Sequence, residues 1–541
     1  MSFQNTICLF AGAALLAAAA GCAQPDRLAV FEDYPRSASL QEDALELRIP
    51  EELQPDLPAD PVPDIPADGV LNLSVEEVIL WALRQNRDLR VQQYNPLIAG
   101  TFEQLERGRF DPELFGQIDY NEEQTTETAR STGTQFNVEA TGAGGGAGIR
   151  QLLPTGTDIE AGIEQQRTVS NRAPEQQEAR AGLTVTQALL RGFGPAVNLV
   201  GVRQAELETT ANIYELRGFT EALLAEAETA YWYYVLADRE IAIFEQSLDI
   251  ARQQRDEILQ RIEVGIMPSI EAAAARAEVA RREQLLINAR SLLRERRLRL
   301  LRIMGPRFAN DPELRIKAAS TPDIAPEPIE DLDNRLQLAL RSRADLHEAN
   351  LRLKQNRLET ILTRNGLLPK LDLFISLGKT GFADTFSDSF KALDGSTYDF
   401  TAGVRLNHFL GNRAAEARHL AARATRQQGR EAVRNLEELI GLDVRLAVNE
   451  VERARQQISA SRVTRELQEK SLSAEKERFD VGASTALLVA QAQRDHLASL
   501  IAEVEAVIHY RLALIQLYLA EGSLLERRGI SLDIKDAAEL L

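Results

Sequence analysis

An internal duplication constrains this 541-residue chain more than any other feature. The segment 82–89 (ALRQNRDL) returns 257 residues later as 339–346 (ALRSRADL). Further along, 261–265 (RIEVG) returns 217 residues later as 478–482 (RFDVG). Self-similarity over such distances predicts two copies of one long structural unit, and not the several independent domains that the length alone would allow.

Each half contains a very long helical stretch. The first runs from about residue 196 to 262 without a proline, and its counterpart runs from 413 to 479. At the usual helical rise, each would be roughly 100 Å long. The shorter stretches 75–109 and 269–304 would each reach about 50 Å, so that two short helices match one long helix. In the second half, apolar residues recur every three or four positions, as in a coiled-coil seam: Val433, Leu436, Ile440, Val444, Ala447, Val451, Ala454 and Ile458.

Between the helices lie segments with the period-two alternation of strands. In 371–377 and 398–406, apolar side chains mostly alternate with polar or small ones, and residues 182–186 continue the pattern in the first half. A strand that is apolar on one side suits a membrane sheet, although a soluble sandwich shows the same alternation. Each half therefore reads as helix, strands, very long helix, turn and helix.

The N-terminus carries two further signals. Residues 1–21 are uncharged and contain an apolar run that is too short to span a bilayer, which predicts a signal peptide. The run ends in small residues before Cys22, a pattern that resembles a lipoprotein cleavage site with Cys22 as the acylated residue. Simple cleavage near Ala20 or Ala23 is the alternative. Residues 22–70 form an acidic, proline-rich arm whose charge of −9 is nearly half of the total of −19.

Composition excludes several classes of protein. A net charge of −19 opposes nucleic-acid binding, which needs a basic face. Two cysteines, Cys8 and Cys22, cannot build a disulfide scaffold or a four-ligand zinc site. The five histidines show no tight metal-ligand spacing, and a ligand site built from distant histidines is the alternative to isolated structural or surface roles. No nucleophile–base set can be assembled from these residues. We therefore expect no enzyme activity, no catalytic residue, no metal and no cofactor other than a covalent lipid on Cys22.

From about residue 71 to 524, the sequence resembles the TolC-like family of outer-membrane efflux proteins, and its N-terminus resembles that of the lipoprotein subtype. The resemblance rests on the paired A-L-x-x-x-x-D-L openings, on Pro112 and Pro369 at the helix-to-strand junctions, and on the paired R-x-x-V-G turns. It implies a mainly α protein with membrane β structure. In this architecture a homotrimer forms one shared β-barrel of 12 strands or more, continued by a long periplasmic α-helical barrel. Four strands per copy would supply the 12.

The expected organisation follows from the duplication. It comprises a signal peptide (1–21), the acidic arm (22–70), a first repeat (71–305), a linker (306–334), a second repeat (335–524) and a C-terminal segment (525–541). Between its strands, the first repeat is 36 residues longer than the second. This extra stretch contains a Gly/Ala tract (142–148) and the turn signal 153–156 (LPTG), so we predict an additional β-hairpin pairing 135–153 with 156–170 at the barrel or its base. A disordered loop is the alternative.

The resemblance also assigns the candidate site. It implies that the two R-x-x-V-G turns are periplasmic tips, which contact an adaptor protein and form the closed entrance. The tip residues are Arg261, Val264, Gly265, Arg478, Val481 and Gly482. The two arginines are the leading contact or latch candidates, and the alternative is that they only offset the helix dipole. Glu271, just beyond the first tip, is expected at the pore constriction, but 487–491 offers no acid in the second half.

The function implied is that of an outer-membrane channel with a periplasmic helical extension. It would be a passive exit duct of a tripartite efflux or type I secretion system, with a periplasmic adaptor, an inner-membrane pump and outer-membrane lipid as partners. The alternative is a coiled-coil scaffold lipoprotein of the cell envelope that forms no pore.

Overall fold

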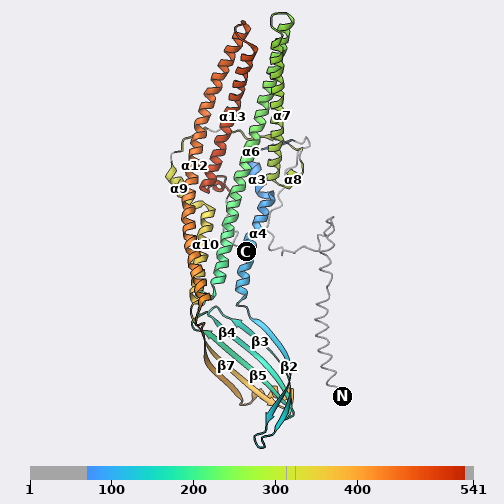
Figure 1. Ribbon diagram of the computed structural model, residues 1–541, viewed down its shortest axis with the longest axis vertical. Helices are drawn as coiled ribbons and strands as arrows, with labels where there is room; N and C mark the ends of the chain where they lie inside the picture. The colour runs from blue at the N-terminus through green and yellow to red at the C-terminus, as the bar shows by residue number, and fades with distance from the viewer. Residues whose placement is uncertain (1–69, 312, 323–324, 330, 531–541) are drawn as a thin grey trace, which may run out of the picture. The chain divides into compact units, whose positions relative to one another are not determined.

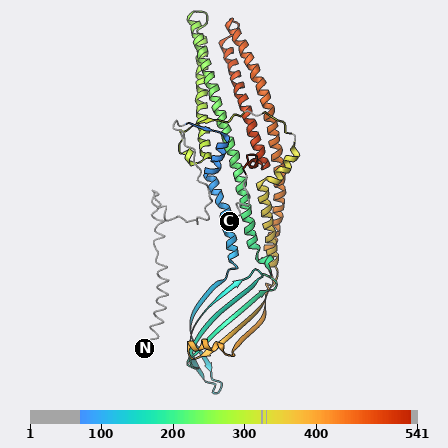
Figure 2. The same ribbon diagram turned by 180° about the vertical axis from the view of Figure 1, so that it is seen from behind.

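In the computed structural model of the chain, two helical hairpins stand side by side on one β-sheet (Figures 1 and 2). The structure describes residues 70–311, 313–322, 325–329 and 331–530. The signal peptide, Cys22 and almost all of the acidic arm lie outside these residues. The first half contains α3 (Val75–Gln85), α4 (Arg87–Gly108), α6 (Val200–Glu263) and α7 (Ile270–Met304). The second half contains α9 (Leu332–Ser342), α10 (Ala344–Gly366), α12 (Arg413–Asp480) and α13 (Ala486–Glu521).

The first helical stretch is divided where the sequence predicts one helix. Ser74 starts α3 with a capping box, in which its Oγ accepts from the Glu77 amide and the Glu77 carboxylate accepts from the Ser74 amide. Asn86 ends α3 in an extended backbone conformation and caps α4 through its Oδ1, which accepts from the Leu89 amide at 3.1 Å. Its Nδ2 donates to the Ile303 carbonyl at 3.1 Å. The prediction of one continuous helix over 75–109 is therefore wrong at Asn86, where the structure has two helices separated by this residue.

The long helix of the second half, α12, packs as its apolar periodicity predicts. Most of the residues named as the seam of α12 are buried: Val433, Ile440, Val444, Val451, Ala454 and Ile458. They face α9, α10 and α13. The largest core lies midway along the helices, where Tyr231 of α6 is fully buried and donates a hydrogen bond to the Leu73 carbonyl at 3.0 Å.

Short elements complete this middle region. Strand β1 (Val70–Leu73) pairs in parallel with β6 (Arg315–Ala318), so the segment between the repeats is tied to the start of the first repeat. Four short helices and one turn of 3₁₀ helix fill the remaining connections: α5 (Pro195–Asn198), α8 (Pro306–Ala309), α11 (Phe386–Lys391), α14 (Leu524–Arg527) and η3 (Ala392–Asp394).

The sheet is a continuous antiparallel sheet with strand order β2-β3-β4-β5-β7-β8. Its strands are β2 (Glu113–Thr128), β3 (Gln135–Leu152), β4 (Thr157–Ser170), β5 (Gln176–Ala188), β7 (Lys370–Ala383) and β8 (Tyr398–Asn407). Strands β3 and β4 pair from Ala140↔Ser170 to Leu152↔Asp158, which confirms the predicted hairpin. The sheet has six strands, two more than the four per copy that give a 12-stranded barrel. It therefore favours a barrel with more than 12 strands.

Candidate functional site

The two tips are built alike, as their shared sequence predicts. In the first, the Gly265 amide donates to the Ile262 carbonyl and the Ile266 amide donates to the Arg261 carbonyl, both at 3.0 Å. In the second, Gly482 and Ala483 repeat both bonds with the carbonyls of Phe479 and Arg478. This is the Schellman motif, which ends a helix with a residue at positive φ. Gly265 and Gly482 supply it, at φ 79° and 77°.

The two tip arginines differ in what they contact. Arg261 donates across the gap between the hairpins to Asp480, with 2.9 Å between Nη2 and Oδ1, and its guanidinium lies over the Phe479 ring. Arg478 instead pairs with Glu475 on its own helix, at 3.1 Å. Of the two tip arginines, therefore, Arg261 is the one that connects the two hairpins. Asp480 was not among the predicted site residues.

Apolar side chains are left exposed at both tips. Val264 is 68% exposed and Val481 is 79% exposed. Ile266 and Ile270 are also exposed. Glu271 lies in the first turn of α7, half-buried, and makes no ion pair among the described residues. Each tip thus presents a valine and an arginine on the same backbone turn, although the two arginines have different partners, and the acid occurs in the first half alone.

A buried polar cluster lies four helical turns or less behind the tips. Glu278 and Arg282 of α7 pair at 2.8 Å, and Arg494 of α13 reaches the same carboxylate at 3.0 Å. Burial lowers the pKa of the Arg282 guanidinium, since desolvation disfavours its charge. The spacing of Glu278 and Arg282 is visible in the sequence as an i,i+4 pair. Their burial against the other hairpin is not visible there.

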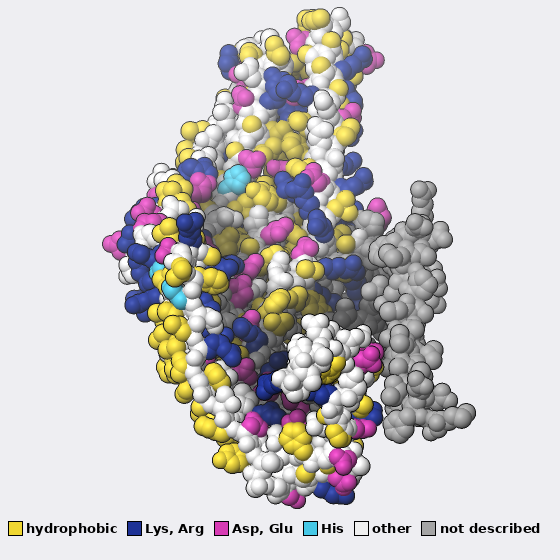
Figure 3. Space-filling view, turned by 60° about the horizontal axis from the view of Figure 1, so that its bottom comes forward, with side chains coloured by type: hydrophobic (Ala, Val, Ile, Leu, Met, Phe, Trp, Pro, Cys, Tyr) yellow, Lys and Arg dark blue, Asp and Glu magenta, His cyan; other side chains and the backbone are white. Residues whose placement is uncertain are grey.

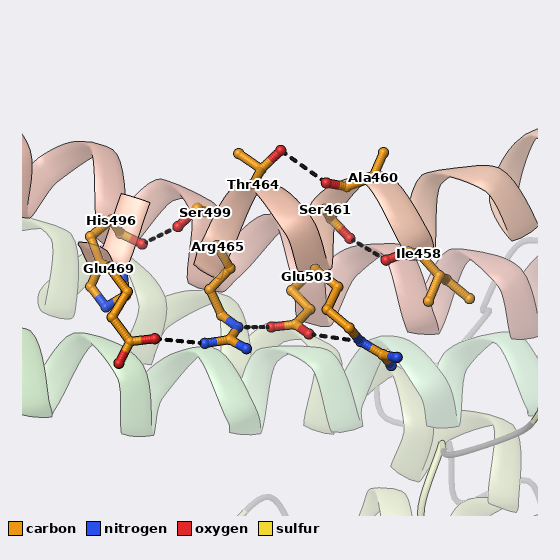
Figure 4. Close-up of polar contacts among 10 residues, drawn as sticks. Ile458, Ala460, Ser461, Thr464, Arg465, Glu469, His496, Ser499 and Glu503 are labelled. Carbon is orange, nitrogen blue, oxygen red and sulfur yellow. Dashed lines mark hydrogen bonds and ion pairs between the residues drawn. The ribbon is translucent and has the colours of Figure 1, made fainter. Parts of the chain in front are cut away.

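A second polar cluster joins α12 to α13 (Figure 4). Arg465 of α12 bonds Glu503 of α13 at 2.6 Å and Glu469 of its own helix at 3.1 Å. His496 lies beside this cluster, and burial lowers the pKa of its imidazole. The cluster interrupts the apolar seam with a cross-helix ion pair and fixes the two helices in register.

The sheet has one apolar face and one polar face. On the apolar face, Leu114, Ile163, Leu183, Leu377 and Val404 come from five different strands and are exposed. On the other face, Arg180 of β5 and Asp399 of β8 form an ion pair at 2.8 Å. Figure 3 looks into the hollow of the sheet, where charged side chains gather, and shows hydrophobic side chains along its outer margin. This arrangement suits a wall between an apolar medium and a wet interior.

Among the described residues, no group of three or more His, Cys, Asp or Glu is placed to hold a metal ion. In this same part of the chain, no helix is long and apolar enough to cross a membrane.

The chain is similar to known outer-membrane proteins in part of its sequence and in its fold. Residues 335–523 match the family model described as outer membrane efflux protein. The Campylobacter jejuni CmeC outer membrane channel is 15% identical, with a TM-score of 0.63 over 86% of this chain and 89% of that chain. The Vibrio cholerae outer membrane protein VceC is 16% identical, with a TM-score of 0.61 over 83% and 96%. The Neisseria gonorrhoeae MtrE channel in its open state is 18% identical, with a TM-score of 0.58 over 83% and 89%. No curated protein matches the sequence.

The fold is thus that of outer-membrane channel subunits: long helical hairpins joined to a sheet with one apolar face. The match to the outer membrane efflux protein family model covers the second repeat, whereas the similarity in fold extends over both repeats. The expected fold class, mainly α with long helices and one β-sheet, is confirmed.

Proposed function

We propose that three copies of this chain form the outer-membrane channel of a tripartite efflux or type I secretion system. The sheet is the observation that carries the proposal. One of its faces is apolar, and β2 and β8 stand at its two edges. An open edge cannot face lipid, because each unpaired backbone group costs several kcal/mol there. Pairing β2 of one copy with β8 of the next removes both kinds of edge at once.

The helical hairpins supply the periplasmic part of the duct. At about 1.5 Å per residue, α6 and α12 each extend roughly 100 Å from the sheet. The exposed valines at their far ends, Val264 and Val481, offer the hairpin of a periplasmic adaptor the same contact twice in every copy. The adaptor then connects the duct to an inner-membrane pump, which supplies the energy.

Glu271 is proposed to contribute one acid per copy to the constriction behind the tips. Its place in the first turn of α7 and its lack of an ion-pair partner among the described residues support this role. Three such carboxylates around one axis would bind cations. Arg261 is proposed as the latch that holds the two hairpins of a copy together.

Isolation from outer membranes tests the channel directly. The full chain is expected to run as a heat-modifiable trimer and to conduct ions in planar bilayers. A scaffold lipoprotein would leave the bilayer non-conducting, which would refute the proposal. The apolar face of the sheet argues against the scaffold, because a scaffold has no use for a lipid-facing surface.

We also propose that Cys22 is acylated and anchors the N-terminus in the outer membrane. The support is the run of small residues before Cys22 at the end of an apolar leader. Metabolic labelling with a fatty acid is expected to mark the wild-type chain and not the Cys22→Ala variant. Normal processing of an unlabelled wild-type chain would remove this claim.

A further inference from the structure

The β3–β4 hairpin is not an appendage of the sheet but occupies its middle. Strand β3 pairs with β2 along its length, from Thr128↔Gln135 to Glu113↔Arg150. Strand β4 pairs with β5 from Thr157↔Gln187 to Thr168↔Gln176. Both outer sides of the hairpin are thus hydrogen-bonded, and it separates β2 from β5 by two full strands.

The hairpin also continues the apolar face without a break. Ile149 of β3 lies opposite Leu114 of β2 on one side and Ala161 of β4 on the other. Next along, Ile163 of β4 lies opposite Ala147 of β3 and Ala181 of β5. A hairpin that stood in water would not need this face, and its side chains match those of the neighbouring strands in position and kind.

Over residues 142–148 of β3 and 158–164 of β4, the opposite face of the hairpin carries only polar side chains or glycines. Glu160 and Glu164 of β4 alternate with Ile159, Ala161 and Ile163 along the strand. In β3, the residues at even positions from 142 to 148 are glycines. This face therefore joins the wet side of the sheet and adds little bulk to it.

The turn of the hairpin is fixed where the sheet meets the helices. The carbonyl of Pro154 accepts from Asn198 Nδ2 and that of Thr155 accepts from the Gly194 amide, both at 3.0 Å. Gly156 has φ 82°, and a Cβ there would lie 2.1 Å from the Gly192 carbonyl oxygen. The turn is built into this junction and leaves no room for a side chain at its glycine.

We infer that the membrane barrel of this protein has 18 strands, six from each of three copies, and that all six are lipid-facing wall. This inference rests on the proposed trimeric channel. Strands β2 and β8 run antiparallel to each other because the sheet has an even number of antiparallel strands. Copies can therefore join edge to edge in the same antiparallel pattern, and three sheets close without a gap.

The width of the helical part favours the same number. Each copy brings four helices to the sheet, namely α4, α6, α10 and α12. Twelve helices packed about 8–10 Å apart need a perimeter of roughly 100–120 Å. Eighteen strands spaced about 4.8 Å apart and tilted by about 40° give roughly 110 Å, whereas 12 strands give only about 75 Å.

A barrel of this perimeter changes what the duct can pass. The exit through the membrane is about 1.5 times as wide as that of a 12-stranded barrel, because barrel diameter grows with strand number. Selection by size then falls to the tips and not to the barrel.

Fluorescent labels in the full-length chain test the wall position of the hairpin. Single cysteines replace Ile163 or Glu164 of β4, in a Cys22→Ala background, and carry an environment-sensitive dye in trimers reconstituted with spin-labelled lipid. The spin-labelled lipid is expected to quench most of the fluorescence of the Ile163→Cys label. A water-soluble quencher is expected to quench most of the fluorescence of the Glu164→Cys label. Leu377→Cys and Ser376→Cys of β7 serve as matched controls.

The outcomes separate the two proposals. If Ile163→Cys is quenched only from water while Leu377→Cys is quenched by lipid, the hairpin lies outside the wall and the 18-strand inference fails, although the channel stands. If neither position meets lipid, both fail. A chain lacking residues 135–172, which leaves β2 to pair with β5, is expected to give trimers with 12 strands in electron cryomicroscopy, against 18 in the wild type. A wild type with 12 strands overturns the inference even if the shortened chain does not fold.

Discussion

Arg261 of the first tip and Asp480 of the second form an ion pair, with 2.9 Å between Nη2 and Oδ1, and join the two hairpins at their far ends. The Arg261 guanidinium carbon also lies 5.2 Å from the centre of the Phe479 ring. Both contacts persist only while the hairpins stay together. An outward movement of one hairpin breaks them, whereas the pair Arg478–Glu475 moves as part of a single helix.

Removing the Arg261 contacts should therefore loosen the closed tip. An exposed ion pair contributes about 0.2–1 kcal/mol and an exposed cation–π contact about 0.5–1 kcal/mol. We expect Arg261→Ala trimers to open several-fold more often in planar bilayers. Arg478→Ala is the matched control, because its partner lies on the same helix, and it should leave conductance near that of the wild type. Equal effects of the two substitutions would contradict a latch role for Arg261.

Replacement of Glu271 tests the proposed constriction. Glu271→Gln removes one charge per copy, so the trimer should lose cation selectivity and block by divalent cations applied from the tip side. Glu263→Gln provides the control, since Glu263 is an exposed acid on the same tip. Unchanged selectivity and block in the Glu271→Gln trimer would place the constriction elsewhere.

The long helices, the strands and their duplication can be predicted from the sequence, because the periodicity of a helix or strand is a local pattern and the second repeat shows it again. The seam residues Ile440, Val444 and Val451 are buried as the period predicts. The break at Asn86 was missed, although an asparagine followed by Asp88 is a recognisable helix start. The hairpin at 135–170 was predicted, but its place between β2 and β5 depends on pairing across the sheet, which no local pattern encodes.

The tip was only partly predictable for the same reason. The two R-x-x-V-G turns look equivalent in the sequence, and their backbones are equivalent. The two arginines are not equivalent. Arg478 forms an ion pair with Glu475, three residues before it on the same helix, whereas Arg261 forms one with Asp480 of the other hairpin. Likewise Glu221, Glu228 and Glu278 read as solvated acids on a helix until tertiary packing buries them.

Glu221 makes the stability of the helical part depend on pH. Burial raises the pKa of this carboxyl to about 7, although Arg217 nearby opposes the shift. The unfolded chain releases this proton near pH 4.3, so the stabilising contribution is complete below that pH and is lost as the pH rises through 7.

Glu221→Gln should remove this dependence, because the amide stays neutral at every pH. We expect equal thermal stability of variant and wild type near pH 4, and an advantage of roughly 3–4 kcal/mol for the variant at pH 8. Thermal unfolding of the purified trimer between these pH values measures it. Glu226→Gln, an exposed acid on the same helix, should show no such trend, and a parallel trend in both variants would refute the assignment.

The C-terminal segment is expected to clamp the helical core through one buried ion pair. Arg528 donates through Nε and Nη2 to the two carboxylate oxygens of Glu228, each at 2.6 Å, and the Glu228 side chain is only 1% exposed. Arg528→Ala leaves that carboxylate buried without its partner, which typically costs about 3–5 kcal/mol. The double variant Glu228→Gln/Arg528→Met removes the charge together with its partner and should recover most of the loss in thermal unfolding. A double variant as unstable as Arg528→Ala would contradict this explanation, because methionine keeps the packing of the arginine stem and no unpaired buried charge remains.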